Sequence, residues 1–305
     1  MRRARVIINP AAGAGRTAGI WPDAVAALRE ANLDPDFVLT QAPGQATALA
    51  QEAARAGVDV VVAVGGDGTA HEVANGLLRE PRCPPLGLIQ TGSGRDLARL
   101  LCLPRGVAAQ ARLLAQADPL SLDVGWCDYE GAAGRERAAF LLLGGAGLSA
   151  RVVRRSIRRK RMARSLTYYL AALREWWTAR AVTAVTVLDG AREELRLLDL
   201  QVLNAPWVGG GMHMAPGADP QDGALELLIT LEQGHWRLLN LLLRLYSGTH
   251  IRRPGVRYGR TKRVRVDPET REPVALDGES VGWTPAEFWV DPGALPVLAK
   301  EIRAG

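Results

Sequence analysis

One stretch of the chain joins an apolar run to a glycine-rich turn that could bind phosphate. The run 58–64 leads directly into Gly65-Gly66-Asp67-Gly68-Thr69. Apolar residues then recur at helical spacing, so the sequence predicts a buried strand, a turn and a helix. N–H groups at a helix N-terminus lack intrahelical acceptors, and glycine lets phosphates approach them closely. We therefore expect the turn to bind a phosphorylated ligand, with Asp67 holding a cation or orienting a partner.

The turn differs from two familiar phosphate-binding motifs. It lacks the G-x-x-x-x-G-K-[ST] spacing of a P-loop and the G-x-G-x-x-G spacing of a dinucleotide-binding turn. An ordinary tight strand-to-helix connection is the simpler interpretation. Three glycines around an acid give more backbone freedom than such a connection requires, which favours a binding role.

The elements around this turn alternate in type over about the first 120 residues. Strands are expected at 5–9, 37–40, 58–64 and 86–89, and helices at 21–31, 45–56 and 69–79. The fourth strand also ends in a glycine-bearing turn, Thr91-Gly92-Ser93-Gly94. This alternation predicts an α/β domain with a parallel sheet and helices on both faces.

The remainder of the chain is rich in short β-type runs. Strands are expected at 139–143, 182–188, 195–203, 225–231, 264–266 and 274–276, with helical patterns at 166–177 and 236–246. This predicts a mainly antiparallel β domain. We expect residues 1–122 to form the first domain and 123–287 the second, with 288–305 returning to the first.

Composition restricts the class of protein and its partners. The chain has 305 residues and a formal net charge of +6, and its cysteines, Cys83, Cys102 and Cys127, lack the spacing of a zinc site or a disulfide framework. We expect a cytoplasmic protein, because the sequence has neither a signal-peptide core nor an apolar run long enough to span a membrane. The positive charge suits nucleic acid, anionic lipid or a phosphorylated substrate, and the sequence leaves a homodimer open.

A basic run precedes a group of aromatic residues. Arg151–Arg164 contains eight cationic side chains and leads into Tyr168, Tyr169, Trp176 and Trp177. The simplest interpretation is a solvated surface helix. Cations followed by aromatic residues favour a peripheral protein resting on an anionic membrane. No recognised nucleic-acid module accompanies the run, so we expect no nucleic-acid partner.

The glycine turn belongs to a set of ordered motifs that resembles the diacylglycerol kinases and related lipid kinases, including sphingosine-kinase-like enzymes. The family's GGDGT followed by N-E-V-x-N-G stands here as residues 65–76. The other matches are the family's N-P-x-x-G at 9–13, G-T-x-N-D-x-A-R in the region 91–99, D-x-G at 123–125, a glycine run at 209–211, D-G-x-L at 222–225 and D-G-E at 277–279.

The resemblance implies a two-domain kinase that uses ATP and Mg²⁺ to phosphorylate a lipid hydroxyl, with diacylglycerol as the first expected acceptor. Phosphoryl transfer needs positioning and charge neutralisation, which explains the acids at these motifs. By resemblance, Asp277 is the general base, Asp67, Asp96 and Asp123 place Mg·ATP, and Asp222 belongs to a structural Mg²⁺ site. The implied nucleotide-binding residues are Asn9, Arg16, Gly65, Gly66, Gly68, Thr69, Thr91, Gly92, Ser93 and Glu279.

Four residues depart from the family's pattern. His71 and Arg95 stand where asparagine is usual, and Leu142 and Ser149 stand where Asn and Asp are common. Two other functions therefore stay open. One is an NAD-kinase-like phosphotransferase, since that family shares the GGDGT turn; the other is a catalytically silent lipid- or nucleotide-binding module.

Overall fold

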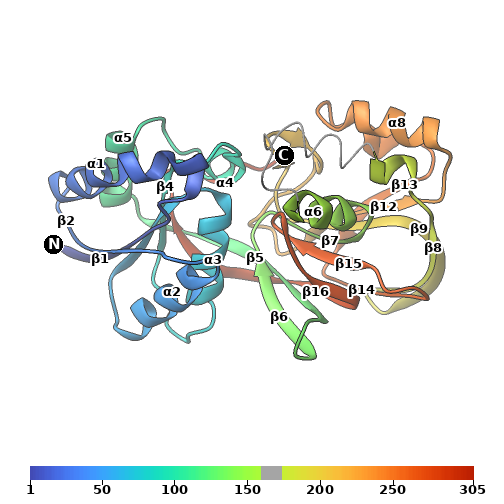
Figure 1. Ribbon diagram of the computed structural model, residues 1–305, viewed down its shortest axis with the longest axis horizontal. Coiled ribbons are helices and arrows are strands. Elements are labelled where there is room, and N and C mark those ends of the chain that lie inside the picture. The colour runs from blue at the N-terminus through green and yellow to red at the C-terminus, as the bar shows by residue number, and fades with distance from the viewer. Residues whose placement is uncertain (159–173) are drawn as a thin grey trace. The chain divides into compact units, whose positions relative to one another are not determined.

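The protein divides into two compact units. The computed structural model describes residues 1–158 and 174–305 (Figure 1). Unit 1 comprises residues 1–124, 209–211 and 292–304, and unit 2 comprises 125–208, 212–291 and 305. The chain thus returns to unit 1 near its end, at residue 292 instead of the expected 288. Residues 209–211 also belong to unit 1, although the sequence placed them within the second domain.

Unit 1 is built on parallel strands in the order β2–β1–β3–β4, and the end of β16 pairs with β4. Its elements are β1 (Arg2–Ile8), η1 (Ala12–Gly15), α1 (Arg16–Glu30), β2 (Leu33–Leu39), α2 (Gln45–Arg55), β3 (Val60–Gly65), α3 (Asp67–Leu77), β4 (Leu86–Gln90), α4 (Asp96–Leu100), α5 (Val107–Gln116) and the start of β5 (Pro119–Glu130). The first helix begins at Arg16, five residues before the predicted start, because Gly15 takes a left-handed conformation directly before it.

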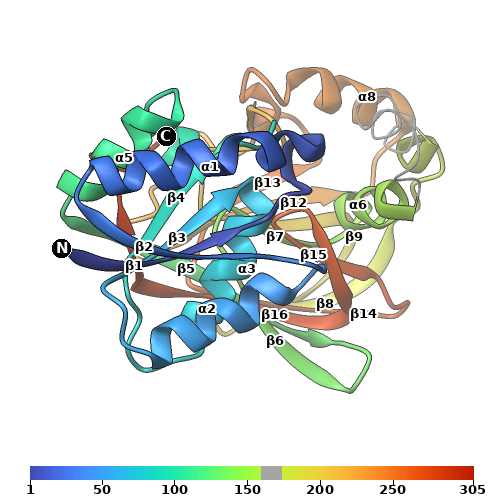
Figure 2. The ribbon, with the colours of Figure 1, turned by 60° about the vertical axis from the view of Figure 1, so that its left-hand side comes forward.

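The helices of unit 1 cover both faces of its sheet. Alternate residues of β1 and β3, including Val6 and Val62, pack with Val25, Leu28 and Leu114 of α1 and α5 in one buried cluster. The pair α2 and α3 contacts the same two strands and lies on the other side (Figure 2). This arrangement leaves the carboxyl ends of β1, β3 and β4 free to carry the glycine-rich turns.

Unit 2 is a β structure in which antiparallel pairing closes on itself. Six strands pair in the order β9 (Ala191–Leu203), β7 (Leu143–Gly147), β15 (Pro273–Leu276), β16 (Glu279–Leu298), β14 (Arg263–Pro268) and β8 (Val182–Leu188), and β8 pairs back with β9. The long strands β9 and β16 each change partners along their length, as corner strands do when they join two packed sheets. Phe140 and Phe288 lie in the hydrophobic core of unit 2, with ring centroids 6.3 Å apart.

The other elements of unit 2 extend this closed arrangement. They are β6 (Arg135–Phe140), α6 (Leu148–Arg158), β10 (Trp207–Val208), β11 (Met212–His213), β12 (Leu225–Leu231), α8 (His235–Arg244), η2 (Thr249–Arg252) and β13 (Val256–Thr261). The strand predicted at 139–143 is wrong as one element, because β6 ends at Phe140 and β7 starts at Leu143.

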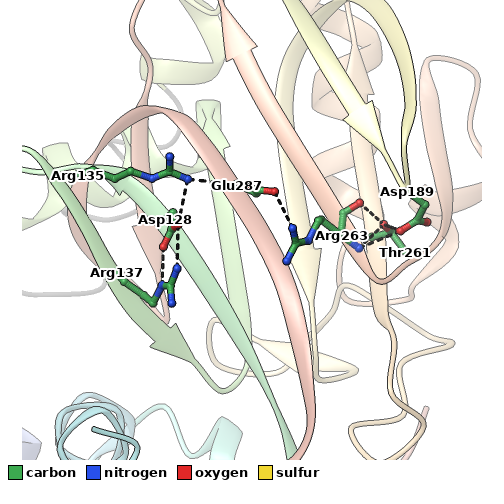
Figure 3. Close-up of polar contacts among 7 residues, drawn as sticks. All are labelled: Asp128, Arg135, Arg137, Asp189, Thr261, Arg263 and Glu287. Carbon is green, nitrogen blue, oxygen red and sulfur yellow. Dashed lines mark hydrogen bonds and ion pairs between the residues drawn. The ribbon is translucent and has the colours of Figure 1, made fainter.

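An ion-pair cluster covers the outer side of β5, β6, β14 and β16 in unit 2 (Figure 3). Arg137 donates to both carboxylate oxygens of Asp128, at 2.7 and 3.1 Å, and Arg135 donates to Asp128 at 3.0 Å. Glu287 pairs with Arg135 and Arg263. The Arg137 hydrogen bonds hold the pKa of Asp128 below its usual range.

No helix within residues 1–158 and 174–305 is long and apolar enough to cross a lipid bilayer.

Candidate active site

Three glycine-rich turns meet in unit 1, at the carboxyl ends of β1, β3 and β4. The N–H of Thr91 donates to Gly65 O at 2.8 Å, which ties the third turn to the second. A Cβ on Gly13 would lie 2.7 Å from Thr91 O, so the first turn also lies against the third. Asn9, at the end of β1, donates from Nδ2 to Thr69 Oγ1 at 3.1 Å. Ligands of parallel α/β sheets bind beyond the carboxyl ends of the strands, where these turns lie.

The second turn presents the N-terminus of α3. Gly66 is the N-cap residue, with extended backbone, and Asp67 and Gly68 begin the helix. Gly65 has no room for a side chain, because a Cβ there would lie 2.3 Å from Thr69 Oγ1. The first N–H groups of an eleven-residue helix therefore face the turn, in the arrangement that binds phosphate.

Asp67 has a backbone partner that the sequence did not reveal. Its Oδ2 accepts the N–H of Asp96 at 3.3 Å, and its Oδ1 accepts the N–H of Leu97 at 3.2 Å. These are N–H groups of the first turn of α4, which lack acceptors within that short helix. Asp67 therefore fixes the position of α4 against the glycine turn, in addition to its expected role in holding a cation.

Arg95 precedes α4 in a left-handed conformation, with φ 56°. Asparagine is several-fold enriched among non-glycine residues in this region, whereas a long side chain gains nothing there. The asparagine of the family's pattern suits this backbone, and the arginine is held in it by the elements on either side.

Asp96 is buried, and both of its carboxylate oxygens have partners. Arg99 donates to Oδ1 at 2.7 Å, and the N–H of Gly210 donates to Oδ2 at 2.7 Å. Sequence reasoning assigned neither contact. Gly210 lies 114 positions after Asp96 in the sequence. The glycine run 209–211 was therefore the one feature of the sequence that pointed to this segment.

Asp123 lies at the middle of β5 and is also buried. Its Oδ1 accepts the N–H of Gly293 at 2.7 Å. The three acids expected to place Mg·ATP thus each accept backbone N–H groups: Asp67 from the first turn of α4, Asp96 from Gly210 and Asp123 from Gly293. Each acid joins segments that are distant in sequence.

Other residues support the turns. Thr17 Oγ1 lies 2.6 Å from Thr91 Oγ1 in a buried contact that the sequence did not predict. Arg16 is exposed and donates from Nε to Gly13 O at 3.0 Å, so it stabilises the first turn. Ser93 is exposed between β4 and α4. His71 is buried in α3, where Asn75 donates to its backbone oxygen at 3.0 Å.

Gln90 is a further residue that the sequence analysis missed. It ends β4 directly before the third turn, and a Cβ on Gly92 would lie 3.3 Å from its Nε2. The residue is only 6% exposed, yet neither atom of its side-chain amide has a hydrogen-bond partner among the described residues. Buried polar groups are normally satisfied, so this amide suits a polar ligand or water at the turns.

Asp277 and Gly278 form the two-residue turn between β15 and β16 in unit 2. Both have positive φ, 47° and 84°, as a two-residue hairpin with Asp-Gly requires. The Asp277 carboxylate accepts three N–H groups, from Leu141 at 2.7 Å and from Leu142 and Leu143 at 2.9 Å each. These donors lie at the break between β6 and β7, which explains why the expected strand 139–143 is interrupted. Glu279 follows as an exposed residue at the start of β16.

Ser149 takes part in a buried polar group of unit 2. Its N–H and Oγ both donate to Asp199 Oδ1, at 3.0 and 2.9 Å, and Gln201 donates to Asp199 Oδ2 at 2.9 Å. Burial raises the pKa of Asp199 to about 6 in spite of these donors. Ser149, which stands where the family commonly has Asp, thus donates two hydrogen bonds to Asp199 of the same unit.

Asp222, expected beside backbone carbonyl oxygens at a structural Mg²⁺ site, has a cationic partner. One carboxylate oxygen pairs with Arg260, and the other accepts the N–H of Ala224 at 3.0 Å. A guanidinium in contact with the carboxylate does not suit a cation site, so these residues do not fit the implied structural Mg²⁺.

The basic run lies partly outside the described residues, which resume at 174. Within α6, Arg151 pairs with Glu272 at 2.8 Å, Arg155 pairs with Glu175, and Arg154 lies 4.0 Å above the ring of Trp283. These three arginines bind groups of unit 2 instead of forming a free cationic face.

Comparison with known proteins identifies both parts of the chain. Residues 3–127 match the diacylglycerol kinase catalytic domain, and residues 144–299 match the YegS C-terminal NAD kinase beta sandwich-like domain. Two proteins named diacylglycerol kinase, from Staphylococcus aureus strains bovine RF122 / ET3-1 and MRSA252, are each 27% identical over 289 residues. The alignments cover 94% of this chain and 89% of each relative.

Solved structures show the same architecture. A diacylglycerol kinase from Bacillus anthracis str. Sterne matches with a TM-score of 0.73 at 22% identity, covering 98% of this chain and 97% of that one. A second structure ascribed to this kinase class, from the same organism, matches with a TM-score of 0.79 at 25% identity and the same coverage. With a catalytic domain followed by a β-sandwich-like domain, the chain belongs to the diacylglycerol kinase family and is a kinase phosphotransferase.

Proposed function

We propose that the protein is an ATP- and Mg²⁺-dependent lipid kinase that transfers the γ-phosphoryl group to a lipid hydroxyl, with diacylglycerol as the first acceptor to test. The observation that carries this proposal is the meeting of three glycine turns at the N-terminus of α3, in a chain of this family. Relatives from Staphylococcus aureus bear the name diacylglycerol kinase, which supports the choice of acceptor.

The turns of unit 1 suit the phosphates of a nucleotide. The N–H groups at the start of α3 would bind phosphate oxygens, and Gln90 and Asn9 would contribute polar side chains beside them. No group of three or more His, Cys, Asp or Glu side chains forms a metal site among the described residues. Mg²⁺ in phosphoryl transfer is commonly held by one or two carboxylates together with substrate phosphates, so it does not require such a group. Bound Mg·ATP would supply the transferable phosphoryl group.

Asp277 is our proposed general base. A base in this reaction must accept the proton of the attacking hydroxyl, so its carboxylate has to be held in one orientation. The backbone N–H groups of residues 141–143 orient the Asp277 carboxylate, and Asp277 is partly exposed. The remaining charge stabilisation would come from the helix N-terminus and the metal.

A transfer assay tests the proposal. The protein is incubated with γ-labelled ATP, Mg²⁺ and vesicles that contain diacylglycerol, other lipid alcohols or no acceptor, and in parallel with NAD. We expect label in the organic phase with diacylglycerol and a requirement for Mg²⁺. The match of unit 2 to an NAD kinase-like domain makes NAD the informative alternative. Label in NAD alone would overturn the proposal, and transfer to no acceptor would support a silent binding module.

A further inference from the structure

Large apolar side chains are exposed together on one side of unit 2. Trp177 is 61% exposed, Trp236 77%, Leu243 75% and Tyr246 58%. Within residues 1–158 and 174–305, the other exposed large hydrophobic side chains are Met1, at 82%, and Phe37, at only 39%, both in unit 1. Grouped exposure of this kind marks an interaction site, whereas single exposed residues need no explanation.

Helix α8 is apolar on two opposite sides. Leu238 and Leu241 are buried and pack with Leu198 of β9, and Trp176 lies against the same cluster. Trp236 and Leu243, seven residues apart, lie on the opposite side, where neither is covered. Helix α8 (Figure 1) is therefore anchored by its inner face, and the described residues leave Trp236 and Leu243 of its outer face exposed.

The exposed aromatic rings support one another. The Trp177 ring stacks on His235 with centroids 5.3 Å apart and an interplanar angle of 18°. It also meets Trp236 edge to face, at 6.5 Å and 87°. Two exposed tryptophans are thus held in defined positions by ring contacts while their surfaces stay open to solvent. Tryptophan and tyrosine are the side chains that favour the membrane–water interface.

Helix α8 itself carries two arginines and no acid, although Glu232 lies just before it and Arg257, beyond it, pairs with Glu193. Residues 233–257 contain five arginines and no aspartate or glutamate. Arg237 and Arg244 lie along one flank of the exposed apolar face, about 80–100° from it at helical spacing. Arg244 donates to Asn240 at 2.9 Å, a neutral partner. The combination of an apolar strip, interfacial aromatic residues and a basic flank complements an anionic bilayer surface.

We infer that Trp177, Trp236, Leu243 and Tyr246, with Arg237 and Arg244, form a docking surface for an anionic lipid bilayer. We refer to these six residues as the α8 surface. The aromatic and leucine side chains enter the headgroup region, and the two arginines contact lipid phosphates. The inference builds on the proposed lipid kinase function, because it states how the enzyme meets a membrane-embedded acceptor. It differs from the expected use of Arg151–Arg164, of which Arg151, Arg154 and Arg155 bind groups within unit 2.

Vesicle sedimentation with the full-length protein tests the α8 surface. Sucrose-loaded vesicles contain either phosphatidylcholine alone or equal parts of phosphatidylcholine and phosphatidylglycerol. We expect wild-type protein to sediment with the anionic vesicles, and the Trp236→Ser/Leu243→Ser variant to bind them about tenfold or more weakly. The Trp236→Phe/Leu243→Phe variant should retain binding, since it keeps large apolar side chains. Phe37→Ser, an exposed apolar residue of unit 1, is the matched control and should bind as wild type.

The basic flank is tested with a charge-matched pair. Arg237→Gln/Arg244→Gln should weaken binding to the anionic vesicles and reduce its dependence on salt. Arg29→Gln/Arg112→Gln removes the same charge from exposed positions of α1 and α5 and should leave binding unchanged. If both pairs weaken binding equally, the attraction is due to overall charge and the docking surface is overturned.

The remaining outcomes separate this inference from the proposed function. Phosphorylation of a short-chain diacylglycerol dispersed in detergent should be unaffected by the α8 variants. If no acceptor is phosphorylated but the serine variant still loses vesicle binding, the docking surface stands and the proposed function fails. The inference is overturned if the serine variant binds anionic vesicles as wild type does. It is also overturned if wild type is a dimer that binds no vesicles and the serine variant is a monomer.

Discussion

Gly92 and Gly66 lie backbone against backbone: a Cβ on Gly92 would be 2.6 Å from the Cα of Gly66. This approach joins the turn after β4 to the turn before α3. Backbone cannot move aside as the end of a flexible side chain can. Gly92 must therefore remain glycine for the phosphate-binding arrangement to form, whereas a Cβ on Gly66 would lie 3.3 Å from the Cα of Gly92, which is tight but can be relieved by a small shift.

We predict that Gly92→Ala destabilises unit 1 and weakens nucleotide binding. The new methyl group must push the second turn away, which displaces the N-terminus of α3. The matched control is Gly19→Ala within α1, where a Cβ would meet nothing within 4 Å. That control should be stabilised by about 1 kcal/mol, because alanine favours helix over glycine. Thermal melting and titration with a fluorescent ATP analogue measure both effects; wild-type nucleotide affinity in Gly92→Ala would contradict the predicted role of the turn.

Exchanges at the two left-handed positions Arg95 and Asn32 should have opposite effects. Arg95 has φ 56° and Asn32 has φ 64°. Asparagine tolerates this conformation better than arginine does, so Arg95→Asn should raise the free energy of unfolding by up to about 1 kcal/mol and Asn32→Arg should lower it by a similar amount. Urea denaturation measures both values. A loss of stability in Arg95→Asn would mean that the arginine side chain makes contacts that outweigh the backbone cost.

The buried carboxyl of Asp199 should make stability depend on pH. Its pKa is about 6 in the folded protein and about 4 in an unfolded chain. The folded state therefore binds the proton more tightly than the unfolded chain does. The stabilisation that this proton adds to the free energy of unfolding is fully present below pH 4. It is lost progressively as pH rises through the folded pKa and amounts to about 3 kcal/mol in total, of which about 2 kcal/mol falls between pH 4 and pH 6. Urea denaturation across this range should show the fall in wild type.

Asp199→Asn should remove that fall. The asparagine oxygen can still accept from Ser149, and its NH2 group can donate to Gln201 once the Gln201 amide turns over. Gln201 Oε1 has no hydrogen-bond partner among the described residues, so it can accept this donor. The difference in unfolding free energy between wild type and the variant should then change by about 2 kcal/mol between pH 4 and pH 6. A constant difference would show that another group is responsible.

Asp277→Asn should abolish phosphoryl transfer and leave nucleotide binding by unit 1 intact. Loss of a general base typically costs about 100-fold or more in rate. The asparagine NH2 also meets a backbone N–H, because the native carboxylate accepts three such groups. We therefore expect a lower melting temperature as well. Asp267→Asn, an exposed acid of β14, is the matched control and should change neither property.

The two effects of Asp277→Asn can be separated. The rate is measured at a temperature where the variant is fully folded, and ATP affinity is measured on the same sample. A rate that falls only in proportion to the unfolded fraction would assign Asp277 a structural role in the hairpin and remove it from the chemistry.

The elements and the family could be predicted from the sequence, because their signals are local. Hydrophobic spacing revealed the strands around Val62 and the helix that carries Leu241, and the ordered motifs identified the kinase family. The domain architecture follows from the same order of elements, and the family matches to both parts of the chain confirm it. The predicted strand 139–143 was wrong because apolar spacing cannot reveal that amides 141–143 turn towards a carboxylate 134–136 positions away.

The sequence by itself determined which residue types are present at the phosphate turn: glycines that let backbones approach, and acids at fixed spacing. Only the tertiary structure decided what each acid contacts. Asp67 binds the start of α4, Asp96 binds Gly210 and Asp222 binds Arg260. The exposure of Trp236 and Leu243 was likewise decided by packing, since α8 could bury only one of its two apolar sides. Local propensity depends on neighbours in sequence, whereas hydrogen-bond partners and exposed faces depend on which distant segments the fold brings together.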